Sequence, residues 1–435
     1  MAVTLGFAMV QLDVSVVNVA VKAIGASFGS GVSGLQWVVD AYTLTFAAFI
    51  LSAGALGDRI GARRTLLGGF VLFTLASVLC GAAPSVLVLV VARAVQGVGA
   101  AALGACSLAL LNHTFAGGVE RARAIRWWAV GGSIAMATGP VAGGVLIAAV
   151  DWRLIFFINV PVGVVGYWLT ARYGRETPRA LDRGVDLPGQ LAGVVALTAL
   201  AGAVIEGGAR GFGAPLVVAG YFVAALAGVV FVLLERRSAR VMLPLSLFRS
   251  RVFSVTAGVG LLINVAFYGL YFSVSLYLQR AEHLSPLVTG LSFLPILVGV
   301  GASNLLAGRI AASFGARRAL ITGAVLMGAG SGLQLAAVSE PVWVAVLALT
   351  VTGAGIGLIV PVITAELMGT VDPSRSGIAS GTLTALRQTG SVLGVALFGS
   401  LLGGFGLTGG LRAGAMVACG LAVFVACLSL VLRRS

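Results

Sequence analysis

Residues 53–64 read AGALGDRIGARR and residues 307–318 read AGRIAASFGARR, so one pattern occurs twice and aligns without a gap. Each copy follows the second long apolar stretch of its half of the chain. Parallel repeats of this kind build membrane proteins from two related helical bundles. The alternative is that a short Gly-Ala-Arg-Arg string recurs by chance beside membrane helices. The matched positions of the two copies favour the repeat.

The composition suits lipid rather than water as the solvent. The 435 residues are 59% hydrophobic and only 10% charged, with a mean hydropathy of +1.07. A helix crosses the hydrocarbon core of a bilayer with about 20 apolar residues, and such stretches recur along nearly the whole chain. Several of them, including 86–91 and 417–432, are apolar on every face, unlike the alternating strands of a β-barrel. The backbone is therefore expected to be helical.

The apolar stretches predict an all-α integral membrane protein with about fourteen membrane-spanning helices. They are expected at 3–25, 33–57, 63–82, 85–112, 122–149, 153–172, 187–207, 214–234, 251–279, 286–311, 317–338, 341–369, 376–403 and 411–432. The longest polar connections, 173–186 and 235–251, bracket two of these helices. We therefore predict an N-terminal six-helix bundle at 1–172, cytoplasmic linkers with an inserted two-helix hairpin at 173–250, and a C-terminal six-helix bundle at 251–435.

The distribution of the positive charges is typical of a membrane protein rather than of a nucleic-acid-binding protein. The net charge is +14, but the arginines form no single patch with interleaved aromatic residues, as a nucleic-acid surface would. They lie in every second connection, which the positive-inside rule assigns to the cytoplasm together with both termini. The clusters are Arg59/Arg63/Arg64, Arg121/Arg123/Arg126, Arg172/Arg175/Arg179/Arg183, Arg236/Arg237/Arg240/Arg249/Arg251, Arg309/Arg317/Arg318, Arg375 and Arg433/Arg434.

Two kinds of chemistry are disfavoured. A phosphate-binding loop of the P-loop type needs a lysine after a glycine, and the one lysine of the chain, Lys22, follows Val21. The two histidines, His113 and His283, are expected on opposite sides of the membrane, so they do not share a metal site. We therefore predict no catalytic residue, no metal ligand and no enzymatic activity.

Five motifs follow one another along the first half of the chain. They read LDVSVVNVA at 12–20, GALGDRIGARR at 54–64, RAVQGVGAA at 93–101, TGPVAGG at 138–144 and DWRLIFFINVPVG at 151–163. Together they resemble the major facilitator superfamily, and within it the fourteen-helix drug:proton antiporter branch. The chain departs from the usual pattern at Val21-Lys22, where Leu-Pro is common, at Ser15 in place of Thr, and at Ala135 in place of Gly.

The resemblance implies a proton-coupled secondary transporter that exports small drug-like or antibiotic molecules by alternating access. It implies the bacterial cytoplasmic membrane, a monomer, and contact with lipid and a small-molecule substrate. No cofactor is expected, because the proton gradient supplies the energy. A proton-coupled importer or symporter, or an exporter of a metabolite, remains the alternative on the same fold. A channel would need a pore-loop filter, for which the sequence offers no candidate.

Three charged residues at membrane depth are candidates for proton coupling. Asp13 lies near the middle of the first predicted helix, where an ionised carboxylate is costly, so it suits a group that gains and loses a proton. A neutral Asp13 that only fixes helix packing is the alternative. Arg93 requires a carboxylate or carbonyls as partners, and Asp13 and Asp40 are expected at comparable depths. The resemblance implies that Arg93 takes part in proton transfer, and a purely structural ion pair is the alternative. For Asp40, proton coupling and a structural role are about equally favoured.

The resemblance also implies gating residues. They are Asp58, Arg59, Gly61, Arg63, Gly139 and Pro140. In the family the Asp of the loop motif pairs with cations to close the cytoplasmic side, whereas Asp58 could also act only as a topogenic charge. The repeat copy has Ala312 and Ser313 in place of this Asp-Arg pair. Gly139-Pro140 predicts a kink and a close helix approach, which either shape the cavity or serve static packing.

Further residues at membrane depth are candidates for lining a substrate cavity. They are Asn18, Gln96, Arg387, Tyr268 and Tyr271. Arg387 lies inside the thirteenth predicted helix and could reach a substrate or a carboxylate. The two tyrosines could stack on a substrate, with core packing as the alternative. Predicted helices nine to eleven contain no acid, so neutral or anionic substrates fit at least as well as cations.

Overall fold

The computed structural model describes residues 2–115, 118–179, 186–237, 243, 245–338, 340–371 and 376–432. Every regular element in these ranges is a helix, which confirms the predicted all-α fold. Some arginines of the predicted cytoplasmic connections lie outside the described residues. These are Arg183, Arg240, Arg375, Arg433 and Arg434.

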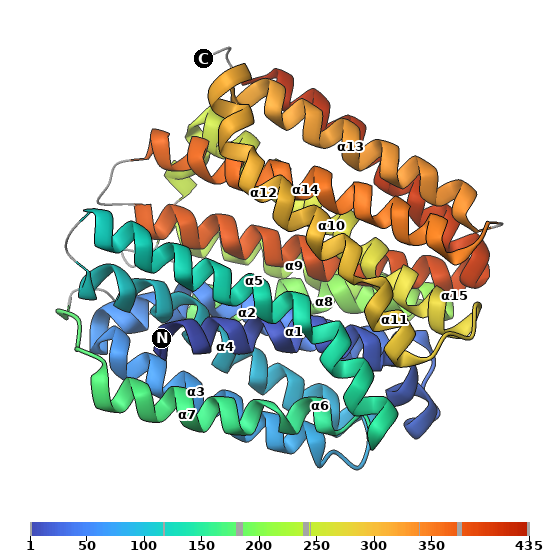
Figure 1. Cartoon of the computed structure of the whole chain (residues 1–435), viewed down its shortest axis with the longest axis horizontal. Coiled ribbons are helices and arrows are strands. Elements are labelled where there is room, and N and C mark those ends of the chain that lie inside the picture. Colours follow the sequence, from blue (N-terminus) through green and yellow to red (C-terminus); the bar gives the residue numbers. More distant parts are fainter. Residues whose placement is uncertain are drawn as a thin grey trace. The chain divides into compact units, whose positions relative to one another are not determined.

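Figure 1 shows the helices in their order along the chain. The first half contains α1 (Ala2–Phe28), α2 (Val32–Ile60), α3 (Ala62–Gly81), α4 (Val86–Thr114), α5 (Gly118–Ala149), α6 (Leu154–Phe157) and α7 (Asn159–Tyr173). Then come α8 (Leu187–Arg210), α9 (Pro215–Arg237) and a 3₁₀ turn, η1 (Leu245–Arg249). The second half contains α10 (Arg251–Arg280), α11 (Pro286–Ser292), α12 (Leu294–Phe314), α13 (Ala316–Ala337), α14 (Val342–Thr370) and α15 (Ser376–Leu430).

Thirteen helices in the described ranges are long and apolar enough to cross a membrane. The last of them, Ile378–Leu430, has 53 residues, far more than the roughly 20 that one crossing needs. Its backbone leaves the helical region at Gly406, where φ is +73° and ψ is 173°. Two spans therefore join at Gly406, which agrees with the fourteen spans predicted from the sequence.

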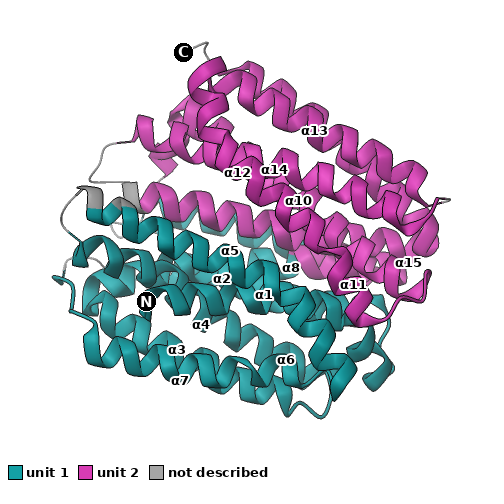
Figure 2. Cartoon of the chain, viewed as in Figure 1, with its two compact units in different colours: residues 1–199, 222–243 teal, residues 200–221, 244–435 magenta. Residues whose placement is uncertain are grey.

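The helices group into two compact units (Figure 2). Unit 1 contains residues 1–199 and 222–243, and unit 2 contains residues 200–221 and 244–435. Within unit 1, α4 packs on α2 and α3, and α1 packs on α5; within unit 2, α10 packs on α15, and α14 packs on α12 and α13. Since the grouping divides α8 and α9 between the units, the inserted hairpin at 173–250 stays a prediction.

The repeat found in the sequence has a structural counterpart. Gly61 joins α2 to α3, and Gly315 joins α12 to α13. Their φ angles are +107° and +82°, in the region that favours glycine. Each glycine also donates its backbone N–H four residues back, to Gly57 O and Ala311 O, at 2.9 Å in both cases. The two copies therefore form the same turn between consecutive helices.

Close contact between α2 and α4 depends on Gly97. A Cβ atom on Gly97 would lie 2.1 Å from Thr45 Oγ1 and 2.2 Å from Tyr42 O. Thr45 Oγ1 also donates to Ala94 O at 2.8 Å, which ties the two helices at the same level. Any side chain at position 97 would therefore push the backbones apart.

We expect Gly97→Ala to lower the free energy of unfolding by about 1–3 kcal/mol, because overpacking forces the two backbones to shift. The measurement is a denaturant titration of the purified protein in micelles, followed by tryptophan fluorescence. Gly68→Ala is the matched control, since Gly68 lies in α3 with no atom within 4 Å of an added Cβ. Equal stability of the two variants would contradict the close approach of α2 and α4.

Candidate functional site

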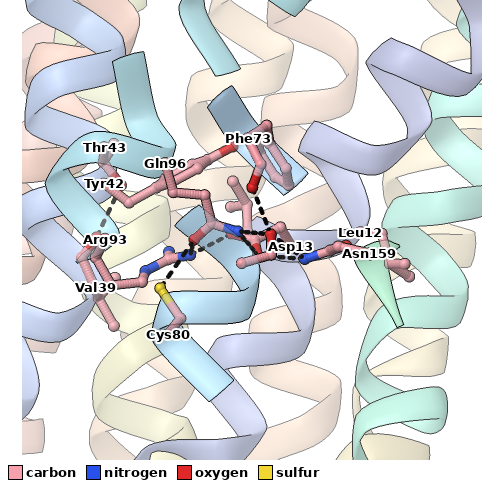
Figure 3. A network of polar contacts seen from close by, with 12 residues as sticks. Leu12, Asp13, Val39, Tyr42, Thr43, Phe73, Cys80, Arg93, Gln96 and Asn159 are labelled. Carbon is pink, nitrogen blue, oxygen red and sulfur yellow. Dashed lines mark hydrogen bonds and ion pairs between the residues drawn. The ribbon is translucent and has the colours of Figure 1, made fainter. Parts of the chain in front are cut away.

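Arg93 and Asp13 form a buried ion pair in unit 1 (Figure 3). Arg93 lies on α4 and donates from Nη1 to Asp13 Oδ2 on α1. The exposed fractions of the two side chains are 1% and 0%. The expectation that Arg93 needs a carboxylate partner at membrane depth is therefore met by Asp13.

The rest of the Arg93 guanidinium is also compensated. Its Nε donates to Val38 O at 3.1 Å, and its Nη1 donates to Gln96 Oε1 at 2.7 Å. The guanidinium carbon lies 4.3 Å from the centre of the Tyr42 ring, a cation–π distance, and 5.8 Å from that of Phe156. Carboxylate, carbonyl, amide and ring together replace the water that this cation lacks.

The second oxygen of Asp13 is held by two amides. Asp13 Oδ1 accepts from Gln96 Nε2 at 2.8 Å and from Asn159 Nδ2 at 3.1 Å. The same two amide nitrogens reach Ser77 Oγ on α3, at 2.8 Å and 3.4 Å. Helices α1, α3, α4 and α7 thus meet at one carboxylate, in an arrangement of donors that suits a charged Asp13.

Two members of this cluster, Asn159 and Ser77, had no role predicted from the sequence, although Asn159 is a polar residue in an apolar stretch of the fifth motif. Gln96 was predicted to line a substrate cavity. In this structure it is completely buried between Asp13, Arg93 and Ser77. Cys80 also donates its thiol to Gln96 Oε1 at 3.6 Å, which closes the cluster on that side.

Asp40 and Asn18 have different surroundings. Asp40 lies on α2 with an exposed fraction of 0%, and neither carboxylate oxygen has a hydrogen-bond partner among the described residues. An ionised group without a partner is costly to bury, so this environment suits a neutral, protonated Asp40. Asn18 is buried on α1 and donates to Val14 O at 2.9 Å.

The Gly139-Pro140 motif packs against the part of α1 that carries Asp13. A Cβ atom on Gly139 would lie 1.9 Å from Ser15 Oγ and 3.2 Å from Leu12 O, and Gly143 is similarly close to Val16. The helix α5 continues through Pro140 from Gly118 to Ala149. Glycine at this position therefore sets how closely α5 approaches the helix turn around Asp13.

The loop motif after α2 is tied to the end of α7. Arg63 donates to Thr170 O at 3.3 Å and to Ala171 O at 2.6 Å, so it caps the carbonyl end of α7. In return, Glu176 Oε1 accepts from the backbone N–H of Arg63 at 3.0 Å, near the beginning of α3. Thr177 Oγ1 accepts from the preceding N–H at 2.8 Å. Each segment therefore satisfies the open backbone groups of the other.

The neighbouring gating candidates differ in exposure. A Cβ atom on Gly61 would lie 2.3 Å from Glu176 Oε1, so glycine makes room for this carboxylate. Arg64 forms an ion pair with Glu176 at 3.7 Å. Asp58 is half-buried, whereas Arg59 is exposed. Glu176 was not predicted to have a role, since it follows a helix in a polar connection.

The remaining cavity candidates lie in unit 2. Arg387 on α15 is partly exposed, and its Cγ packs against Gly260 of α10, the helix that also carries Tyr268. Tyr268 is also partly exposed, whereas Tyr271 is buried and stacks on Phe293 at a centroid distance of 4.4 Å. Tyr271 therefore belongs to the packed interior, while Arg387 and Tyr268 are accessible.

Comparisons with known proteins identify relatives of this chain. The family profile described as Major Facilitator Superfamily matches residues 3–304 and 256–435. The chain is 39% identical over 401 residues to the multidrug resistance protein Stp of Mycobacterium tuberculosis, an alignment that covers 92% of this chain and 75% of that one. It is 37% identical to the methylenomycin A resistance protein of Streptomyces coelicolor, covering 92% and 84%. The crystal structure of a D-xylose-proton symporter has the same fold, with a TM-score of 0.69, 16% identity and coverage of 98% and 95%.

We expect Asp13→Leu to destabilise the protein by about 3–5 kcal/mol, because it leaves the Arg93 charge buried without its carboxylate. The double variant Asp13→Leu/Arg93→Met should regain much of this loss, since both charges are then absent. A double-mutant cycle from denaturant titrations in micelles measures the coupling.

The exposed pair Glu206–Arg210 provides the matched control. Its N–O distance is 2.7 Å, but the two side chains are 25% and 58% exposed, so its coupling should stay below about 1 kcal/mol. The coupling free energy of Asp13 and Arg93 should exceed that of Glu206 and Arg210, measured with Glu206→Leu/Arg210→Met. Equal coupling free energies would contradict a compensated ion pair in the interior.

Proposed function

Because the chain belongs to the major facilitator superfamily, whose members are transporters and not enzymes, we propose that it exports small drug-like or antibiotic molecules by proton-driven alternating access. It is a multi-pass membrane protein that contacts lipid and a small-molecule substrate, and such transporters use ion gradients without a cofactor. Export is supported by the relatives named for multidrug and methylenomycin A resistance. Proton coupling rests on one observation, the buried Asp13–Arg93 pair.

Asp13 is the proposed proton carrier. One elementary charge moved across 100 mV corresponds to about 2.3 kcal/mol, and some group at membrane depth must carry it. Protonation removes the carboxylate charge that compensates Arg93, so the guanidinium must find other acceptors. The contacts of α1 with α4 and α5 then change together. Substrate and proton thereby favour different states of one transporter, which makes the exchange obligatory.

Asp40 is proposed as a second proton-coupling residue. Its lack of a partner supports a bound proton in the state described here, whereas Asp13 is paired with Arg93 in that state. The two acids therefore differ in what compensates their charge. This difference allows one acid to hold a proton while the other is ionised.

The topology and assembly follow from the charge pattern and the site. The arginine clusters support a bacterial cytoplasmic membrane location with both termini in the cytoplasm. The proposed organisation is two six-helix bundles with an inserted hairpin. A monomer is proposed, in line with what the family resemblance implies.

Everted membrane vesicles test the function directly. With an acidic lumen as the driving force, wild-type vesicles should accumulate members of a panel of antibiotics and dyes, and a protonophore should abolish the accumulation. Asp13→Asn should still insert and bind substrate but should not concentrate it, because the variant carries no exchangeable proton. Glu340→Gln, which alters an exposed acid, is the control and should transport normally.

Two results would count against this proposal. Proton-driven uptake of panel compounds into intact cells would replace the exporter with an importer. If Asp13→Asn still concentrates substrate when only a pH difference is imposed, Asp13 is not the carrier, and Asp40→Asn is the next variant to measure.

Gating is assigned to the loop motif and to the glycines of α5. The residues are Asp58, Arg59, Gly61, Arg63, Gly139 and Pro140. The support is the mutual capping of α3 and α7 by Arg63 and Glu176, and the close contact of Gly139 with α1. Charge pairing of Asp58 that exists in only one access state would hold the cytoplasmic side closed in that state.

We expect Asp58→Asn to fold but to expose Cys106, because the end of α2 loosens when the charge is removed. Cys106 is 1% exposed, and its sulfur lies 2.7 Å from the position of a Cβ on Gly57, next to Asp58. The measurement is maleimide labelling of Cys106 in a variant whose other cysteines are serine. Asp58→Glu keeps the charge and should label as slowly as the parent; unchanged labelling in Asp58→Asn would leave Asp58 only a topogenic charge.

A further inference from the structure

Arg387 lies deep within unit 2. It is eleven residues from the beginning of α15 at Ser376, which places its Cα about 16 Å along the helix. The hydrocarbon core is about 30 Å thick, so this position is close to the middle of a crossing. Its side chain begins against Gly260 of α10, where an added Cβ would lie 3.1 Å from Arg387 Cγ.

The described part of the chain provides no counter-charge for Arg387. Its Nε is buried without a hydrogen-bond acceptor, and no described carboxylate forms an ion pair with the guanidinium. Residues 244–435 contain only four acids, Glu282, Glu340, Glu366 and Asp372. Glu282 and Glu340 lie outside the helices, Glu366 is near the end of α14, and Asp372 is outside the described residues.

Arg93 and Arg387 differ in how their charges are compensated. Arg93 is almost completely buried, and a carboxylate, a carbonyl, an amide and an aromatic ring compensate its charge. Arg387 remains partly exposed instead, so its guanidinium is accessible to a molecule that enters from outside the protein interior. A buried cation without a partner is unfavourable, and an anionic ligand would remove that penalty.

An aromatic cluster lies on α10, the helix against which the Arg387 side chain packs. The Tyr268 ring meets the Phe267 ring edge to face, with the ring centroids 5.4 Å apart. Phe267 continues to Tyr271 at 5.9 Å, and Tyr271 stacks on Phe293. A charged group next to a rigid aromatic cluster fits a ligand with an anionic group on a flat apolar body.

We propose that Arg387 binds the anionic group of the substrate, and that the substrates include lipophilic molecules with one carboxylate or similar oxyanion. The guanidinium fork would hold such a group by two parallel hydrogen bonds, and Tyr268 would contact the apolar body. The statement about substrates rests on the proposed function. The anion site itself does not, because binding requires no gradient.

Two dyes with the same ring system and opposite charge test the site. Binding of anionic fluorescein and cationic rhodamine 123 is measured by fluorescence anisotropy, with purified protein in nanodiscs. Arg387→Gln should weaken fluorescein binding about tenfold or more and leave rhodamine 123 binding unchanged. Arg387→Lys keeps the charge without the fork, so its loss should be smaller. Arg251→Gln, at the exposed beginning of α10, is the matched control and should bind both dyes like the wild type.

Equal fluorescein affinity in the wild type and in both Arg387 variants overturns the anion site, as does an equal loss of both dyes. Arg387→Lys decides the question if Arg387→Gln does not fold. The vesicle assay separates this inference from the proposed function. If the vesicles transport no panel compound but fluorescein binding depends on Arg387, export is refuted and the anion site is supported. If the vesicles export panel compounds but fluorescein binding does not depend on Arg387, only the anion site is refuted.

Discussion

Arg93 carries a positive charge that the membrane interior cannot solvate, and the helices around it are arranged to compensate that charge. Its carboxylate comes from α1, a carbonyl and a ring from α2, and an amide from α4 itself. Asn159 of α7 then completes the hydrogen bonds of Asp13. Residues of α1, α2, α4 and α7 therefore meet around one ion pair, and a change in the charge of Asp13 affects several helices at once.

Glycines make this arrangement possible, because polar groups can meet only where backbones come close. Gly97 brings α2 to α4 at Tyr42, whose ring lies on Arg93. Gly139 brings α5 to α1 at Leu12 and Ser15, beside Asp13. Two motifs that look separate in the sequence thus support the same ion pair. Protonation of Asp13 would change the contact between α1 and α5, and this contact connects proton coupling with the proposed gating motif.

The two units each contain an arginine at membrane depth, but they differ in how its charge is compensated. In unit 1 the guanidinium of Arg93 is buried and donates to a carboxylate, a carbonyl and an amide. In unit 2 Arg387 Nε has no acceptor among the described residues, and the side chain remains partly accessible. The repeat therefore carries the same turn at Gly61 and Gly315 but different chemistry. We therefore propose proton handling for unit 1 and substrate recognition for unit 2.

The sequence by itself determined the membrane helices, the repeat, and the need of Arg93 for a partner such as Asp13 or Asp40. These follow from local properties, because apolar length and a charge inside it can be read from neighbouring residues. Only the tertiary structure decided that Arg93 pairs with Asp13, that Gln96 and Asn159 bind this carboxylate, that Glu176 caps α3, and that Arg387 has no ion-pair partner among the described residues. Asn159 and Asp13 are 146 residues apart. Helices that are apolar on every face carry no periodicity to show which side meets which neighbour, so side-chain partners are set by packing alone.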